Sequence, residues 1–226
     1  MEHPLNALVT GGTLRAAINT GNKALVQYDG GQLSGVSPAL AQRLADHLGV
    51  ELEPVIYAGA GKVFADAHAD KWDVAFLAID EMRANEISFT QAYHTIDATY
   101  AVRADATFAS VSDIDRAGVR VLASTGSAYD MYLQAGLKSA ALEHSGTPPE
   151  SFAEFQAGRC DAVAGVRASL IGSFGDDPAF RILPDVLARV SQAMVLPMPD
   201  NPLIGALDAF VAEAIAEGFV AKHLDF

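Results

Sequence analysis

Cationic residues are scarce in this chain. Only 15 of its 226 residues are Lys or Arg, against 28 Asp and Glu, so the formal net charge is −13. Because a nucleic-acid partner requires clustered cations, this balance argues against nucleic-acid binding. Cys160 is the only cysteine, which excludes an intramolecular disulfide and a cysteine-based metal site. No run of about 18 apolar residues occurs, so the sequence predicts no membrane span.

The apolar content, in contrast, is sufficient for a large core. Half of the residues are hydrophobic and only 19% are charged, which is typical of a folded protein with one large domain or two small lobes. The first twelve residues, MEHPLNALVTGG, lack the cationic start and apolar stretch of a signal peptide. We therefore expect either a cytoplasmic protein or the mature form of a periplasmic protein with a replacement Met.

Strand-like and helical segments alternate along the chain and are interrupted near residues 103–112. Before the break the sequence predicts strands at 13–18, 51–57, 73–78 and 98–102, and helices at 37–47 and 61–69. After it, strands are predicted at 119–123, 140–143, 161–166 and 186–196, and helices at 127–135, 149–157, 167–174 and 202–216. This alternation predicts two α/β lobes with mostly parallel sheets covered on both faces.

Ligands of α/β sheets bind at the carboxyl ends of the strands. Asn19, Ala78, Ser124 and Val166 all fall near such ends, so we expect one cleft between the lobes to collect them. Arg83 lies just beyond the third predicted strand. Its planar fork of donors suits a carboxylate ligand, and the alternative is an ordinary surface salt bridge with a nearby glutamate, Glu81 or Glu86.

Three further positions are candidates for anion binding. The segment from Ser124 to Ser127 joins a strand to a helix, so its N–H groups suit a carboxylate or phosphate, although an ordinary N-cap explains it equally. Arg167 repeats the strand-end position of Arg83, and the alternative is an arginine that faces solvent. Lys62 either points into the cleft or is solvated. The glycines before it form no phosphate loop, because Ile56 and Val63 break that motif.

Catalytic motifs are absent from the sequence. It contains no HExxH, no GxSxG and no cysteine with a nearby histidine partner. Asp80 with Glu81, or His94, could act as acid or base, but a solvated turn and a structural histidine are the simpler interpretations.

Several spacings resemble the family 3 solute-binding proteins of bacterial ABC importers, the amino-acid-binding type. The segment GQLSGVSPALAQRLADHLG, at residues 31–49, is similar to the first helix of the family. Residues 72–93 hold a Trp-Asp pair followed at set spacings by Arg83, Ile87, Phe89, Thr90 and Tyr93. GVRV with a later GS, at 118–127, and GRCDAV, at 158–163, are further points of similarity. The resemblance extends from about residue 12 to the C-terminus.

This resemblance implies an α/β periplasmic-binding-protein-like fold of type II, with two lobes, a two-segment hinge and a ligand cleft between the lobes. Lobe one is expected at 1–102 plus 196–226 and lobe two at 103–195, with crossings near 100–103 and 192–196. The implied function is capture of a small solute for the membrane subunits of an ABC transporter. We expect a monomer that uses no cofactor and no metal.

The resemblance also implies site residues. The arginine at the position of Arg83 holds the α-carboxylate of the ligand in this family, with help from N–H and hydroxyl groups at Ser127. The chain departs from the pattern elsewhere, because residues 75–78 lack Ser and Thr, Ala60 replaces a covering aromatic, and Val166 replaces the carboxylate that pairs with the ammonium group. Asp80 is the remaining candidate for that charge.

A desolvated ammonium group without an anionic partner costs several kcal/mol. We therefore predict that the ligand is a small organic anion, such as a dicarboxylate, keto acid or hydroxy acid. The predicted ligand-binding residues are Arg83, Ser127, Arg167, Asn19, Asn22, Lys62, Ala78, Ser124 and Tyr129. Two alternatives stay open: an enzyme on the same scaffold, similar to cyclohexadienyl dehydratase with Asp80, Glu81 or His94 as the acid, and an intracellular ligand-sensing module.

Overall fold

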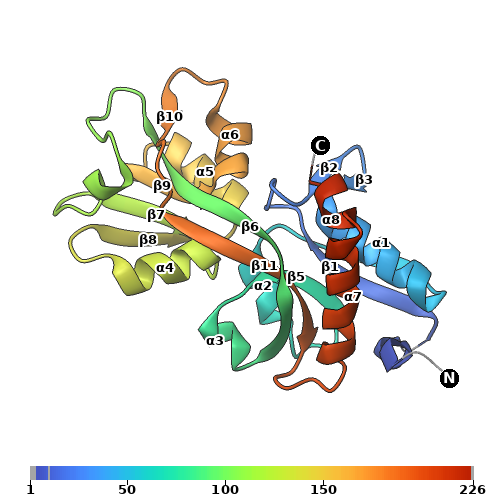
Figure 1. The fold of residues 1–226 in the computed structure, drawn as a ribbon. Coiled ribbons are helices and arrows are strands. Elements are labelled where there is room, and N and C mark those ends of the chain that lie inside the picture. Colours follow the sequence, from blue (N-terminus) through green and yellow to red (C-terminus); the bar gives the residue numbers. More distant parts are fainter. Residues whose placement is uncertain (1–3, 10, 225–226) are drawn as a thin grey trace.

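The structure is a computed structural model that describes residues 4–9 and 11–224, and it consists of two α/β bodies joined by long strands (Figure 1). The first body contains η1 (Pro4–Leu8), β1 (Thr13–Asn19), β2 (Gln27–Asp29), β3 (Gln32–Ser34), α1 (Val36–Leu48), β4 (Glu51–Tyr57), α2 (Ala60–Ala65), β5 (Val74–Ala78), α3 (Glu81–Ala84), α7 (Ile204–Ala216) and α8 (Phe219–Lys222). The second contains η2 (Val111–Asp113), β7 (Arg120–Ser124), α4 (Ala128–Gly136), β8 (Ala141–Ser145), α5 (Pro148–Gln156), β9 (Ala162–Val166), α6 (Arg167–Phe174) and β10 (Phe180–Ile182). The strands β6 (Ile87–Arg103) and β11 (Ala188–Pro197) run between them.

One nine-stranded sheet passes through both bodies. Its order is β4-β1-β5-β11-β6-β9-β7-β8, and β10 pairs with β6. The outer pairs are parallel: β1 with β4 and β5, and β7 with β8 and β9. The pairs in the middle are antiparallel, so the prediction of mostly parallel sheets is wrong there. The reason is that β6 is a single strand of 17 residues, of which only 98–102 was predicted, and it pairs antiparallel with β9, β10 and β11.

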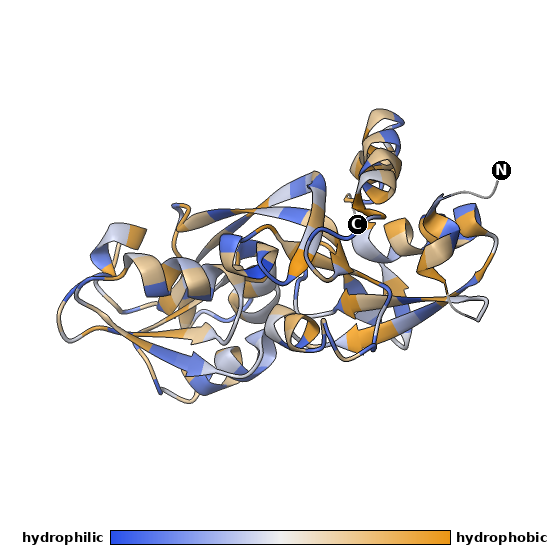
Figure 2. Ribbon diagram, turned by 90° about the horizontal axis from the view of Figure 1, so that it is seen from below, coloured by the Kyte–Doolittle hydropathy of each residue, from blue (hydrophilic) through white to orange (hydrophobic). Residues whose placement is uncertain are grey.

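The core is one large apolar cluster with two smaller ones beside it. The large cluster extends into both bodies and includes Leu14, Leu40, Tyr100 and Val121, all at most 1% exposed. A second cluster surrounds Trp72 in the first body, and the third contains several phenylalanines in the second body. Figure 2 shows hydrophilic and hydrophobic residues on the same helices, as expected for helices that cover a sheet with one face. No helix in residues 4–9 and 11–224 is long and apolar enough to cross a membrane.

The two ends of α1 show that local sequence signals predicted one helix boundary correctly and the other incorrectly. Gly49 ends α1 in the left-handed conformation, with φ of 67°, as its glycine predicts. Ser37 followed by Pro38 is typical of an N-cap at the start of the helix predicted at 37–47, but that prediction is wrong, because α1 begins at Val36 with Gly35 as its N-cap. The hydroxyl of Ser37 instead lies 3.2 Å from the hydroxyl of Tyr93, on β6. The Ser37 side chain therefore contacts Tyr93, which is 56 residues away in the sequence, instead of capping the helix.

The aromatic cluster of the second body offers a test of its packing. Phe155 is fully buried, and its ring centroid lies 5.7 Å from that of Phe174 and 5.4 Å from that of Phe180. We predict that Phe155→Ala lowers the free energy of unfolding by about 3–5 kcal/mol, because it leaves a cavity in a packed core. Urea unfolding followed by circular dichroism measures this change. Tyr132→Ala is the control, since Tyr132 is 52% exposed and should change stability by less than about 0.5 kcal/mol. Equal losses in both variants would contradict this account of the core.

Candidate ligand-binding site

A small cavity lies where the two bodies meet. Its volume is about 40 Å³. The polar residues that line it are Asn19, Asn22, Arg83, Ser127, Tyr129, Ser169 and Gln192, and the other lining residues are apolar or glycine. No Asp or Glu of the described chain lines this cavity. A cation therefore has no counter-charge on the cavity wall.

Among the described residues, Arg83 is the one charged side chain on that wall. It belongs to the short helix α3 and is only 1% exposed. Its Nη1 donates to the carbonyl oxygen of Ala78 at 3.1 Å, and its Nη2 donates to that of Gly126, in the second body, at 2.6 Å. The alternative of a surface salt bridge with Glu81 or Glu86 is excluded, because the guanidinium is buried and bonded to backbone carbonyls.

The electrostatics of Arg83 favour an anionic ligand. Burial lowers the pKa of its guanidinium to about 10, and the nearby charge of Asp80 partly offsets this shift. The side chain is therefore still charged at neutral pH. Two of the five guanidinium donors bond the carbonyls of Ala78 and Gly126, which leaves three with no partner among the described residues. A buried charge in this condition is stabilised by an anion that brings hydrogen-bond acceptors.

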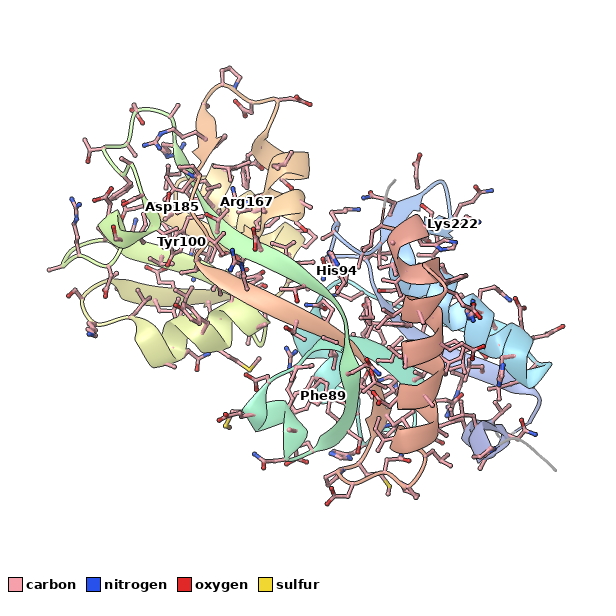
Figure 3. All side chains as sticks on the ribbon, viewed as in Figure 1. Phe89, His94, Tyr100, Arg167, Asp185 and Lys222 are labelled. Atoms are coloured by element: carbon pink, nitrogen blue, oxygen red, sulfur yellow. The ribbon has the colours of Figure 1, made fainter. Side chains whose placement is uncertain are left out.

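Asp80 does not supply the missing negative charge to the cavity. Its Oδ1 accepts hydrogen bonds from the backbone N–H groups of Met82, at 2.9 Å, and Arg83, at 3.2 Å. It thereby caps α3 and fixes the backbone that carries Arg83. Asp80, Glu81 and His94 all lie outside the set of lining residues. His94 lies on β6 (Figure 3), and burial lowers its pKa.

The strand-to-helix junction of the second body faces Arg83 from the opposite side. Ser127 is the N-cap of α4, and its Oγ accepts the N–H of Asp130 at 3.1 Å. The fully buried carboxylate of Asp130 accepts the N–H of Gly126 at 2.9 Å, while its other oxygen lies 2.9 Å from Nε2 of His144. The N-cap interpretation is therefore confirmed, and part of the donor capacity of this loop is used within the loop.

The two bodies also touch directly around the cavity. A Cβ added to Gly61 would lie 2.4 Å from the carbonyl oxygen of Thr125, so only glycine fits there without a shift. On the other side, the hydroxyl of Ser169 donates to the carbonyl of Gly21 at 3.0 Å and accepts the N–H of Lys23 at 3.1 Å. Together with the bond from Arg83 to Gly126, these contacts close the cavity from both sides.

The structure brings six of the nine predicted ligand-binding residues to the cavity wall. They are Asn19, Asn22, Ala78, Arg83, Ser127 and Tyr129. Ser124 lies behind this wall, with its Oγ 2.6 Å from the hydroxyl of Tyr129. Lys62 is exposed on α2 and is not a lining residue.

Arg167 turns away from the cavity. Its guanidinium donates to the backbone carbonyls of Leu183, Pro184 and Asp185 at 3.0, 3.0 and 2.8 Å. Figure 3 shows Arg167 and Asp185 together in the second body. The expected convergence of Arg83, Arg167 and Lys62 is therefore not what the structure shows. The strand-end position of Arg167 was correct, but carbonyls of a neighbouring loop attract its side chain.

Gln192 and Ser169 line the cavity but were missed as candidates. They are 4% and 3% exposed. Gln192 is a long polar residue directly before the apolar run AMVL of β11, and a polar residue at that place in a strand was a usable signal. Ser169 lies on α6 among polar and apolar neighbours, and no sequence signal distinguishes it.

Two α/β bodies, crossed by two long antiparallel strands and sharing a polar cavity, define the architecture of type II periplasmic binding proteins. The sequence profile of the bacterial extracellular solute-binding proteins, family 3, matches residues 14–225, so the chain belongs to that family. The resemblance and the fold class predicted from the sequence are thereby confirmed. The predicted lobe boundaries stay a prediction.

Solved structures agree with this fold. A mutant of ArgBP from T. maritima has a TM-score of 0.84 and 21% identity, covering 98% of this chain and 97% of that chain. AbpA from Streptococcus pneumoniae, an amino acid ABC transporter substrate-binding protein bound to L-arginine, has a TM-score of 0.82 and 23% identity, covering 97% and 95%. An ancestral amino-acid-binding protein, a precursor of cyclohexadienyl dehydratase, has a TM-score of 0.79 and 22% identity, covering 96% of each chain. The comparison with curated proteins gave no match.

The contact at Gly61 leads to a prediction about closure. We predict that Gly61→Ala holds the two bodies further apart, because its Cβ would meet the carbonyl of Thr125 at 2.4 Å. Small-angle X-ray scattering should then give a larger radius of gyration than for the original chain. Gly205→Ala is the matched control, since a Cβ there meets nothing within 4 Å and the site lies in α7. Unchanged scattering of the Gly61 variant would contradict the prediction.

Proposed function

We propose that this protein is the solute-binding component of an ABC importer and that its ligand is a small organic anion whose carboxylate binds Arg83. The observation that carries this proposal is the cavity wall itself. It holds one buried guanidinium with three unused donors and no acidic side chain among the described residues. A carboxylate satisfies those donors in a charge-assisted, bidentate geometry.

The same wall disfavours a ligand with an ammonium group, because such a group requires an anionic partner. Moving an ammonium group out of water costs several kcal/mol unless a negative partner compensates for it. Val166 lines the cavity at the position where the family resemblance implies such a partner. Asp80 does not line the cavity, and its Oδ1 is used in the cap of α3. A dicarboxylate, keto acid or hydroxy acid avoids this cost.

Opening of the two bodies is the step that admits the ligand. The contacts around Gly61 and Ser169 join the two bodies beside the cavity, so a ligand enters when these contacts separate. The strands β6 and β11 are the connections about which the bodies can turn, with residues 1–102 plus 196–226 in one lobe and 103–195 in the other. A ligand that contacts both lobes then favours the closed state, because its affinity for that state is higher.

A binding role fits better than catalysis or intracellular sensing. The elimination chemistry of a cyclohexadienyl dehydratase needs a general acid beside the substrate. The three candidates, Asp80, Glu81 and His94, are not lining residues. Since the family consists of extracellular proteins, we also propose a periplasmic location, a monomeric state and delivery of the ligand to the membrane subunits of the transporter.

A thermal-shift panel tests the ligand class. We predict that propionate, lactate, succinate or malate raises the melting temperature, because a ligand that binds only the folded state stabilises it by mass action, about 2.7 kcal/mol at a hundred times Kd. Alanine and arginine should leave it unchanged, since the wall offers no partner for their ammonium group. A shift with alanine or arginine and none with the carboxylates would refute the proposed ligand class.

A substitution at Arg83 tests the proposed anchor. We predict that Arg83→Met weakens binding of the same carboxylates roughly a hundredfold, because two charge-assisted hydrogen bonds are lost. Isothermal titration calorimetry measures the change, and circular dichroism checks that the variant folds. Arg189→Met is the matched control, because the Arg189 side chain is 76% exposed and Arg189 does not line the cavity. Unchanged affinity in a folded Arg83 variant would remove Arg83 from the site.

A further inference from the structure

The side-chain amide of Gln192 has no hydrogen-bond partner among the described residues. The residue is 4% exposed, and no described residue forms a hydrogen bond with its side chain. The amide atoms of Gln192 are not among the fully buried, unpartnered atoms of the described residues, so they are open to the cavity that Gln192 lines. Polar side-chain groups in such a place usually have a hydrogen-bond partner, either protein or solvent. An unsatisfied amide on a cavity wall therefore points to a partner that enters with the ligand.

The position of Gln192 in the sheet directs its side chain into the cavity. Its backbone pairs with Ala78 of β5 on one side and with His94 of β6 on the other. Side chains two residues apart on a strand share one face, and Val190 also lines the cavity, as does its β6 partner Ile96. The amide of Gln192 thus belongs to the cavity floor rather than to the opposite face of the sheet.

Gln192 and Arg83 meet at the same corner of the cavity. Ala78 is the direct cross-strand partner of Gln192, and the carbonyl of Ala78 accepts the hydrogen bond from Nη1 of Arg83 at 3.1 Å. Residues opposite one another on neighbouring strands have Cβ atoms about 5 Å apart. A carboxylate held by Arg83 therefore brings the substituent on its 2-carbon next to Gln192.

The chemistry of an amide limits what this substituent is. An amide offers two donors and one acceptor, so it can bond a hydroxyl in either direction and can donate to a keto oxygen. It carries no charge to compensate an ammonium group. Resting on the proposed function, we propose that Gln192 determines specificity by recognising a neutral oxygen on the 2-carbon, so that the ligand is a 2-hydroxy or 2-oxo acid.

Calorimetry with matched ligand pairs tests this inference. Propionate and lactate share three carbons and differ by the 2-hydroxyl group, as succinate and malate do with four. The original chain is expected to bind at least one of these two pairs. Within that pair, we expect the hydroxy acid to bind at least about tenfold more tightly than the unsubstituted acid. Gln192→Met should remove this preference and leave the unsubstituted acid bound within about threefold, since Met has a similar length and no amide.

The controls separate this inference from the proposed function. Gln134→Met, on an exposed position of α4, should keep the full preference for the hydroxy acid. If the two acids of a pair bind equally and Arg83→Met weakens both, the role of Gln192 is refuted while the carboxylate site stands. A preference that survives Gln192→Met also refutes it. If neither pair binds, or if Arg83→Met binds as the original chain does, the proposed function fails and the inference fails with it.

Discussion

The buried guanidinium of Arg83 imposes the constraint on which the cavity depends. A charge that is 1% exposed must be compensated, and three parts of the chain contribute to that compensation. Ala78 presents a carbonyl at the end of β5, Gly126 presents another from the second body, and Asp80 both caps α3 and lies close enough to favour the charged form. The two carbonyls are neutral and the charge of Asp80 offsets only part of the effect of burial, so an anionic ligand has a place to bind.

The long antiparallel strands link this site to the connection between the bodies. β5, β11 and β6 are hydrogen-bonded side by side, so Ala78 and Gln192 occupy neighbouring positions in the sheet. The same β11 that contributes Gln192 to the cavity continues into the second body. A ligand that bonds Arg83, Gln192 and the junction at Ser127 would therefore contact both bodies and the strand between them. That arrangement favours closure when the ligand binds.

The composition of the cavity wall connects the two proposals. A site for an ordinary amino acid needs positive and negative partners in a small space, whereas this wall offers one cation and several neutral polar groups. Arg83 then accounts for a carboxylate, and Gln192 accounts for a neutral oxygen beside it. The family and fold establish a solute-binding scaffold, but the choice of solute depends on these few side chains.

The sequence by itself determined the local elements and half of the site. The strand at 51–57 and the helix at 167–174 were predicted with their observed bounds, because alternating apolar residues and strand-to-helix junctions are local signals. Arg83 was also visible, since strand ends locate cavity residues, and the family resemblance showed that Val166 replaces a carboxylate. Only the tertiary structure decided the antiparallel centre of the sheet, the bond of Ser37 to Tyr93, the turn of Arg167 toward the 183–185 carbonyls, and the exposure of Gln192 to the cavity. Each of these depends on which distant segment supplies a hydrogen-bond partner, and no local pattern encodes that.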